Sequence, residues 1–129
     1  MSFKMAIIVN SDLNMSKGKI VAQTGHAMVE ATIKAYTQTT NFYKWQTDGE
    51  TIIAVKANLK TLQTVCGIAE RKGIHSGYVV DAGRTEVAPG SITVGYVGPD
   101  KTDKIIVKIM PIIVPSYVFP LLIFGIILF

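Results

Sequence analysis

Short apolar runs alternate with longer amphipathic segments along this 129-residue chain, and that alternation predicts an α/β fold. The length suits one domain with its own hydrophobic core. Hydrophobic residues make up 49% of the chain and charged residues 17%, which excludes an intrinsically disordered protein. Strands are expected at residues 5–9, 51–56, 78–80 and 91–97, and helices at about 19–36, 41–47 and 59–71.

Start and stop signals support these elements. Ser16 and Asn58 precede the first and third predicted helices, where a side-chain oxygen can accept a hydrogen bond from a free amide. Gly73 suits the end of the third helix, because glycine adopts a left-handed conformation at little cost. Gly98 and Pro99 are expected to break the last strand, because proline has no amide hydrogen to donate.

The connections between strands predict how they pair. One helix separates the second strand from the third, which favours a parallel pair. The connection 81–90 contains no predicted helix, which favours antiparallel pairing of the third and fourth strands. If the second and third strands are parallel neighbours, Lys56 and Asp81 lie at the same rim and form an ion pair there. A purely structural salt bridge is the alternative interpretation.

A polar stripe runs along the first predicted helix. Its members are Lys19, Gln23, His26 and Glu30, whose spacing places them on one face. The rest of the helix is mostly apolar, as in a buried helix, so the stripe needs a polar surface to face. The alternative is the solvent-exposed face of an ordinary core helix.

The loop DAGRTEVAPG, residues 81–90, combines flexible backbone with polar groups. Gly83 allows a positive φ or a close backbone approach. Arg84 can bind a phosphate through two donors, although a solvated Arg84 in an ordinary connection is the alternative. Hydroxyl groups follow at Thr85, Ser91 and Thr93.

Several kinds of site are not expected. Cys66 is the only cysteine, so no internal disulfide can form, and its apolar helix face indicates a core residue rather than a nucleophile. His26 and His75 have no metal-ligand spacing, and no metal site is predicted. The N-terminal apolar run is too short for a signal peptide, which favours a cytoplasmic protein. The net charge of +4 suits an anionic partner such as RNA without identifying one.

Residues 109–129 contain no charged side chain, and this segment is long enough to cross a membrane. Three lysines before it suit a cytoplasmic flank, namely Lys101, Lys104 and Lys108. Pro115 and Pro120 oppose a spanning helix because proline interrupts helical hydrogen bonding.

Three interpretations of this segment remain open: a C-terminal membrane anchor, additional packing on the domain, or an altered end without function. The expected organisation is therefore a domain over residues 1–108 and an apolar tail over residues 109–129.

Three blocks of the chain carry most of these polar residues: SDLNMSKGKIVAQTGHA, the VK that ends TIIAVK, and DAGRTEVAPGSITV followed by GP. Together these blocks resemble the peptidyl-tRNA hydrolase 2 family. The family pattern is TDL-x-M-x-x-GK-x-AAQ-x-x-HA, then a strand ending in Lys, then DAG-x-T-x-x-xPGS-x-T. The blocks occur in the family's order and spacing over about residues 4–99. This resemblance implies a mixed four-stranded sheet with helices on both faces, a three-layer α/β/α sandwich that is often a homodimer.

The resemblance also implies an activity, namely hydrolysis of the ester in peptidyl-tRNA without a metal or other cofactor. The family's functional positions fall on Lys19, Lys56, Asp81 and Thr93, with His26 and Thr85 in the same motifs. We expect Asp81 to orient or deprotonate water, and Lys56 or Lys19 to stabilise charge. Binding of the tRNA substrate is expected at Lys17, Gln23, Arg84 and Ser91. A non-catalytic RNA-binding module and a membrane-anchored interaction protein on the same fold are the alternatives.

The chain departs from the family pattern after residue 99. Family members continue with a short helix and a last strand that ends near LKL. Here DKTDKIIVKIM is too short for both, and VKIM (residues 107–110) is the expected substitute for the strand. Smaller departures are Thr24, where cysteine is common, and Gly95, where a larger apolar residue is common.

Overall fold

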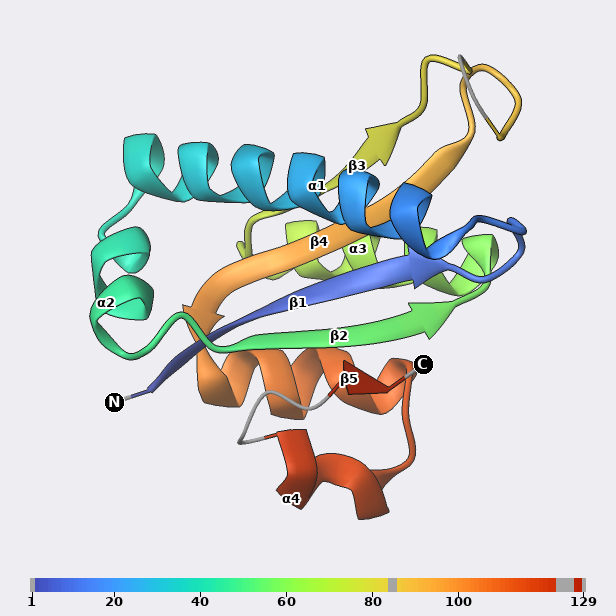
Figure 1. Cartoon of the computed structure of the whole chain (residues 1–129). Coiled ribbons are helices and arrows are strands. Elements are labelled where there is room, and N and C mark those ends of the chain that lie inside the picture. The colour runs from blue at the N-terminus through green and yellow to red at the C-terminus, as the bar shows by residue number, and fades with distance from the viewer. Residues whose placement is uncertain (1, 84–85, 123–126, 129) are drawn as a thin grey trace.

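The structure is a computed structural model that describes residues 2–83, 86–122 and 127–128 (Figure 1). Its first seven elements are β1 (Phe3–Asn10), α1 (Lys17–Gln38), α2 (Asn41–Thr47), β2 (Ile52–Ala57), α3 (Leu59–Arg71), β3 (Ser76–Val80) and β4 (Ile92–Lys101). The C-terminal segment adds η1 (Lys104–Ile109), η2 (Met110–Ile112), η3 (Ser116–Val118), α4 (Phe119–Leu122) and β5 (Ile127–Leu128). Every strand and helix predicted before residue 98 is present, and both predicted caps form, through Ser16 and Asn58.

The sheet has the order β3-β4-β1-β2-β5, and β4 runs antiparallel to both of its neighbours. The predicted mixed four-stranded sheet is confirmed, with the two-residue β5 added in parallel beside β2. Antiparallel pairing of β3 with β4 is also confirmed. The predicted pairing of β2 with β3 is wrong, because β4 and β1 lie between them. β1 is buried along its whole length, so it takes the central position, which is covered on both faces.

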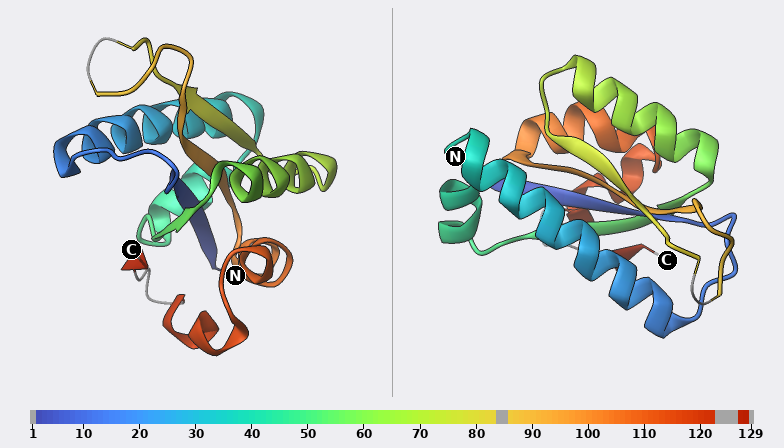
Figure 2. Two further views of the ribbon diagram at one scale, coloured as in Figure 1. Left: turned by 90° about the vertical axis from the view of Figure 1, so that its right-hand side faces the viewer. Right: turned by 90° about the horizontal axis from the view of Figure 1, so that it is seen from above.

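Helices cover both faces of the sheet, as predicted (Figure 2). α1 and α2 lie on one face, and α3 and η1 lie on the other. The buried side of α1 contains Ala27, Ala31 and Ala35, which share one stripe because each is four residues from the next. These small side chains allow α1 to lie close to β4.

β4 continues past Gly98 and Pro99 to Lys101, so the predicted end of this strand is wrong. Gly98 has a φ of 92° and its amide donates to the carbonyl of His75 over 2.7 Å. The pairing register between β1 and β4 shifts at this point. Because the shift accommodates the proline, the ladder resumes beyond it and pairs Lys101 with Phe3.

The C-terminal segment packs against the α3 face of the sheet. Ile109, Met110 and Leu122 are fully buried in the same cluster as Leu62 and Val65 of α3. The expected strand at 107–110 is wrong, because these residues continue the helical turns of η1 and η2. Ile109 and Met110 thereby join the core cluster on this face, whereas Val107 is exposed. This burial favours the packing interpretation of the tail, while the domain boundary after residue 108 stays a prediction.

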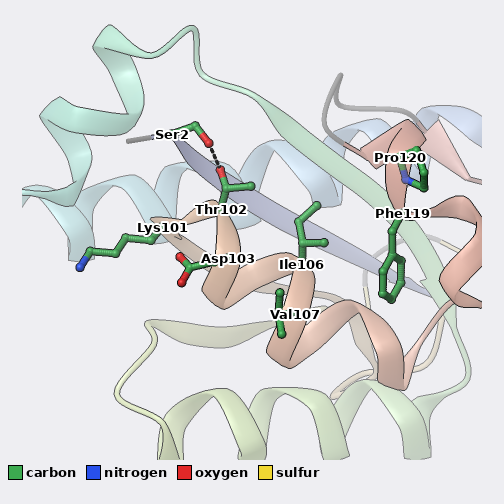
Figure 3. Close-up of a pocket in the computed structure, with 8 residues that line it drawn as sticks. All are labelled: Ser2, Lys101, Thr102, Asp103, Ile106, Val107, Phe119 and Pro120. Carbon is green, nitrogen blue, oxygen red and sulfur yellow. Dashed lines mark hydrogen bonds between the residues drawn. The ribbon is translucent and has the colours of Figure 1, made fainter.

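Among the residues that the structure describes, no helix is both long enough and apolar enough to cross a membrane. A cavity of about 730 Å³ lies between η1 and α4 (Figure 3). Ile106 and Val107 of η1 line one side, and Phe119 and Pro120 line the other. Ser2 and Thr102 close one end through a hydrogen bond between their hydroxyls. The C-terminal segment is therefore well packed at Leu122, whereas the contact between η1 and Phe119 and Pro120 of α4 leaves a cavity.

Candidate active site

Asp81 directly follows β3, in a turn that holds its backbone at both ends. Its amide donates to the carbonyl of Ser91, and its carbonyl accepts from the amide of Gly90, both over 2.9 Å. The amide of Gly83 donates to the carboxylate over 2.5 Å. Gly83 has a φ of 74°, and an added Cβ would lie 2.4 Å from Pro89. Only glycine fits there, so the loop geometry that orients Asp81 depends on it.

Lys19 supplies the cation that faces Asp81. It lies in the first turn of α1, where the Ser16 hydroxyl accepts a hydrogen bond from the Lys19 amide over 3.1 Å. The Lys19 ammonium lies 2.5 Å from Asp81 Oδ1, and the side chains are 12% and 6% exposed. Lys19, and then the Gly83 amide, hold the pKa of Asp81 below its ordinary value. Asp81 is therefore a carboxylate at neutral pH.

The expected ion pair between Lys56 and Asp81 is wrong. Both residues lie at the rim formed by the carboxyl ends of their strands, but two other strands separate β2 from β3. Lys56 is exposed, and its neighbours Val55 and Ala57 face the α3 side. Because side chains alternate along a strand, Lys56 projects on the α1 side of the sheet. It shares that side with Lys19.

A buried pair of polar side chains lies beneath the ion pair. The Gln23 amide donates to the hydroxyl of Thr93 over 2.9 Å, and that hydroxyl donates to the Val79 carbonyl over 3.2 Å. Thr93 is the extra residue of a bulge, since Val79 pairs with Val94 while Val80 pairs with Ile92. The bulge turns the Thr93 side chain toward α1. Thr93 therefore ties α1 to both strands at this point.

The polar stripe of α1 divides into two parts. Lys19 and Gln23 face the sheet, whereas His26 and Glu30 are exposed. Lys19, Gln23 and His26 line a cavity of about 360 Å³ together with Val79, Val80, Asp81 and Ala82. The interpretation of a buried helix with an inward polar stripe therefore holds for Lys19 and Gln23, and that of a solvent-exposed face holds for His26 and Glu30. The outer face of α1 exposes four large apolar side chains, Val21, Val29, Ile33 and Tyr36.

The other predicted site residues have varied surroundings. Lys17 is exposed in the first turn of α1. The Ser91 hydroxyl donates to the Ala88 carbonyl over 2.7 Å and so supports the loop. Arg84 and Thr85 lie outside the described residues. The roles of these residues stay predictions.

Two residues that the sequence analysis did not select help to build the site. The Glu86 carboxylate accepts from the Ser16 amide over 2.8 Å and from the Ser16 hydroxyl, which lowers the pKa of Glu86. Asn10, at the end of β1, donates to the Ile92 carbonyl over 2.8 Å. In the sequence, only their positions could have identified these two residues: Glu86 lies inside the glycine-rich loop, and Asn10 lies at the end of a strand.

Cys66 is a core residue, as predicted. It lies in α3 with a side chain 4% exposed, among apolar neighbours. Burial raises the pKa of its thiol to about 12. The thiolate needed for nucleophilic attack is therefore scarce at neutral pH.

Comparison with known proteins gives consistent matches over this region. The family model described as peptidyl-tRNA hydrolase PTH2 matches residues 3–110. The peptidyl-tRNA hydrolase of Methanocaldococcus jannaschii is 36% identical over 104 residues, which cover 79% of this chain and 90% of that protein. The peptidyl-tRNA hydrolase of Thermoplasma acidophilum is 39% identical over 104 residues, 79% of this chain and 89% of that protein. The human protein named peptidyl-tRNA hydrolase 2, mitochondrial, is 38% identical over 105 residues, 80% of this chain and 59% of that protein.

Proposed function

This chain belongs to the peptidyl-tRNA hydrolase PTH2 family, and we propose that it uses the Lys19–Asp81 pair to hydrolyse the ester that joins a peptide to tRNA. The observation that carries the proposal is the pair itself, nearly buried and beside a cavity that can admit an ester. A module that only binds RNA has no need of a carboxylate close to phosphates. The Asp81 carboxylate therefore favours chemistry over binding alone.

The proposed reaction starts from a water molecule that Asp81 orients. The water oxygen attacks the ester carbonyl carbon while its proton passes to the carboxylate. The carbonyl oxygen gains negative charge, which the Lys19 ammonium stabilises. The bond from that carbon to the ribose oxygen then breaks, and the ribose oxygen takes up the proton that Asp81 accepted from water, which restores the carboxylate. The products are a peptide with a free carboxyl group and tRNA with a free hydroxyl.

The remaining site residues support these two groups. The Thr93 hydroxyl donates a hydrogen bond to the Val79 carbonyl and accepts one from Gln23, so we propose that Thr93 positions Gln23 and α1. His26 borders the cavity and is exposed, which suits exchange of protons with solvent. The exposed cations Lys17 and Lys56 suit contacts with tRNA phosphates.

The test is release of free tRNA by the purified full chain from N-acetyl-aminoacyl-tRNA. We expect cleavage in excess chelator and little cleavage of the unblocked aminoacyl-tRNA. Tight binding of tRNA with no cleavage of the ester would select the binding module instead.

Two partners besides tRNA follow from exposed apolar surfaces. The outer face of α1 suits a homodimer contact, and light scattering of Ile33→Asp against the parent chain tests it. Tyr117, Leu121 and Lys108 are all exposed in the C-terminal segment, which suits contact with an anionic membrane surface rather than a span. Sedimentation with anionic vesicles tests this, with Tyr117→Ser expected to weaken binding and Val29→Ser expected to leave it unchanged. We also propose that the protein acts in the cytoplasm.

A further inference from the structure

β3 is an edge strand of the sheet, and it leads directly into Asp81. The sheet order places β4 on one side of β3 and no described strand on the other. α1 and α3 flank this edge on the two faces of the sheet (Figure 2). An edge strand carries a row of backbone donors and acceptors that can pair with another extended chain.

The hydrogen bonds show which groups of β3 face outward. His75 accepts from Gly98, and Asp81 donates to Ser91, so the odd-numbered residues point their backbone toward β4. Because backbone direction alternates in an antiparallel pair, the amide and carbonyl groups of Ser76, Tyr78 and Val80 point away from it. The Ser76 carbonyl accepts from the Lys34 ammonium of α1 over 3.3 Å, which agrees with that direction. The extra bulge residue lies in β4, so the alternation along β3 is not interrupted.

The outward edge has a cavity at each end. The one beside Asp81 has about 360 Å³ and includes Val79 and Val80 in its lining. The other has about 420 Å³ and includes Ile74, His75 and Ser76. Space therefore borders β3 at its first residue and again at its last two residues beside the ion pair. Val80, in the lining of the cavity beside Asp81, is 58% exposed, so no described element covers its side chain.

We propose that the peptide part of the substrate binds along β3 as an added strand, parallel to β3, with its last residue at Asp81. The proposal rests on the hydrolase function above, because the ester attacked by the water that Asp81 orients is the C-terminal end of the peptide. The N-terminal end of the peptide then lies toward Ser76, and the peptide runs from there to Asp81 in the same direction as β3. Backbone pairing recognises peptides of any sequence, which suits an enzyme whose substrates differ in every side chain.

The same geometry gives a reason for the expected selection against unblocked aminoacyl-tRNA. The outward amide of Val80 lies one residue before Asp81, where it can donate to the carbonyl of the last peptide bond. An aminoacyl-tRNA has an ammonium group in that place and has no carbonyl to accept the bond. A buried or half-buried donor left without its acceptor reduces the stability of the complex.

The test uses tRNAs charged with N-acetylated alanine peptides of one to seven residues. We expect kcat/KM to rise about threefold to tenfold for each pairing position gained, mainly through a lower KM. The rise should stop when the peptide reaches about the length of β3, which has five residues. N-methylation of single peptide amides should reverse the gain at alternate residues only, because alternate residues face β3.

A matched pair of variants tests the protein side. Tyr78→Pro and Tyr78→Ala remove the same aromatic side chain, but only the proline variant also removes the outward amide. Both should cleave the one-residue substrate at equal rates, and only Tyr78→Pro should lose the gain with peptide length. Circular dichroism of both variants checks that the sheet is intact, and the N-methyl series does not depend on either.

The outcomes separate the two proposals. Cleavage with the same kcat/KM at every peptide length, or with no effect of any N-methyl group, overturns strand addition and leaves the hydrolase function intact. No cleavage of any substrate overturns the hydrolase function itself. Loss of a dimer in Tyr78→Pro with the length dependence unchanged would assign the β3 edge to a second copy of the chain and overturn the peptide site.

Discussion

Leu122→Ala tests whether the C-terminal segment is part of the domain. Leu122 is fully buried in the core cluster on the α3 face, 14 residues beyond the boundary expected from the sequence at Lys108. Replacing a buried leucine with alanine removes its transfer free energy and leaves a cavity, which together cost about 2–5 kcal/mol. That cost is a large part of the roughly 5–15 kcal/mol that stabilises a domain of this kind.

Urea denaturation measures the effect directly. With a slope of about 2 kcal/mol per molar urea, we expect the midpoint to fall by about 1–2.5 M while the slope stays unchanged. The neighbouring residue provides the control, because Leu121 is 46% exposed and its change to alanine should alter the free energy of unfolding by about 0.5 kcal/mol or less.

Equal and small effects of Leu122→Ala and Leu121→Ala would refute the reasoning, because a tail that does not pack on the core cannot distinguish them. That result would favour the anchor, and a chain ending at Lys108 should then fold unaided. If the tail completes the core, the same shortened chain should instead lose its cooperative urea transition.

Four further predictions concern the site. In Lys19→Met the pKa of Asp81 should rise toward its ordinary value, since Lys19 is the main cause of its depression. The acid side of the pH profile of kcat/KM should therefore move to higher pH. An unchanged acid side would contradict the pairing of Lys19 with Asp81. The sign follows because a depressed pKa keeps Asp81 charged as the pH falls below about 4, so the active form is lost only at still lower pH. Asp81→Asn should lower kcat more than it raises KM, whereas a change confined to KM would make Asp81 a binding residue. Lys56→Ala, which removes an exposed phosphate contact, should mainly raise KM, and a fall confined to kcat would contradict that assignment. Arg84→Ala should weaken tRNA binding and flatten its dependence on salt by about one phosphate contact, and an unchanged salt slope would remove Arg84 from the RNA surface.

Local interactions made several features readable from the sequence alone. Ser16 and Asn58 cap their helices through bonds to amides three residues ahead, so the signal and the structure lie in one turn. Gly83 and Asp81 form their turn within three residues, and the motif around them carried the family resemblance. The fold class followed in the same way, from the alternation of strand and helix patterns.

Long-range packing decided the rest. The sequence placed Lys56 and Asp81 on one rim, but the partner of Asp81 depends on strand order, and the central position of β1 makes that partner Lys19. An apolar run such as 109–129 reads alike whether it crosses a membrane or fills a core, because composition does not record what surrounds a side chain. Only the tertiary contacts of Ile109 and Leu122 with the α3 face distinguish the two, since burial is a property of the whole folded chain.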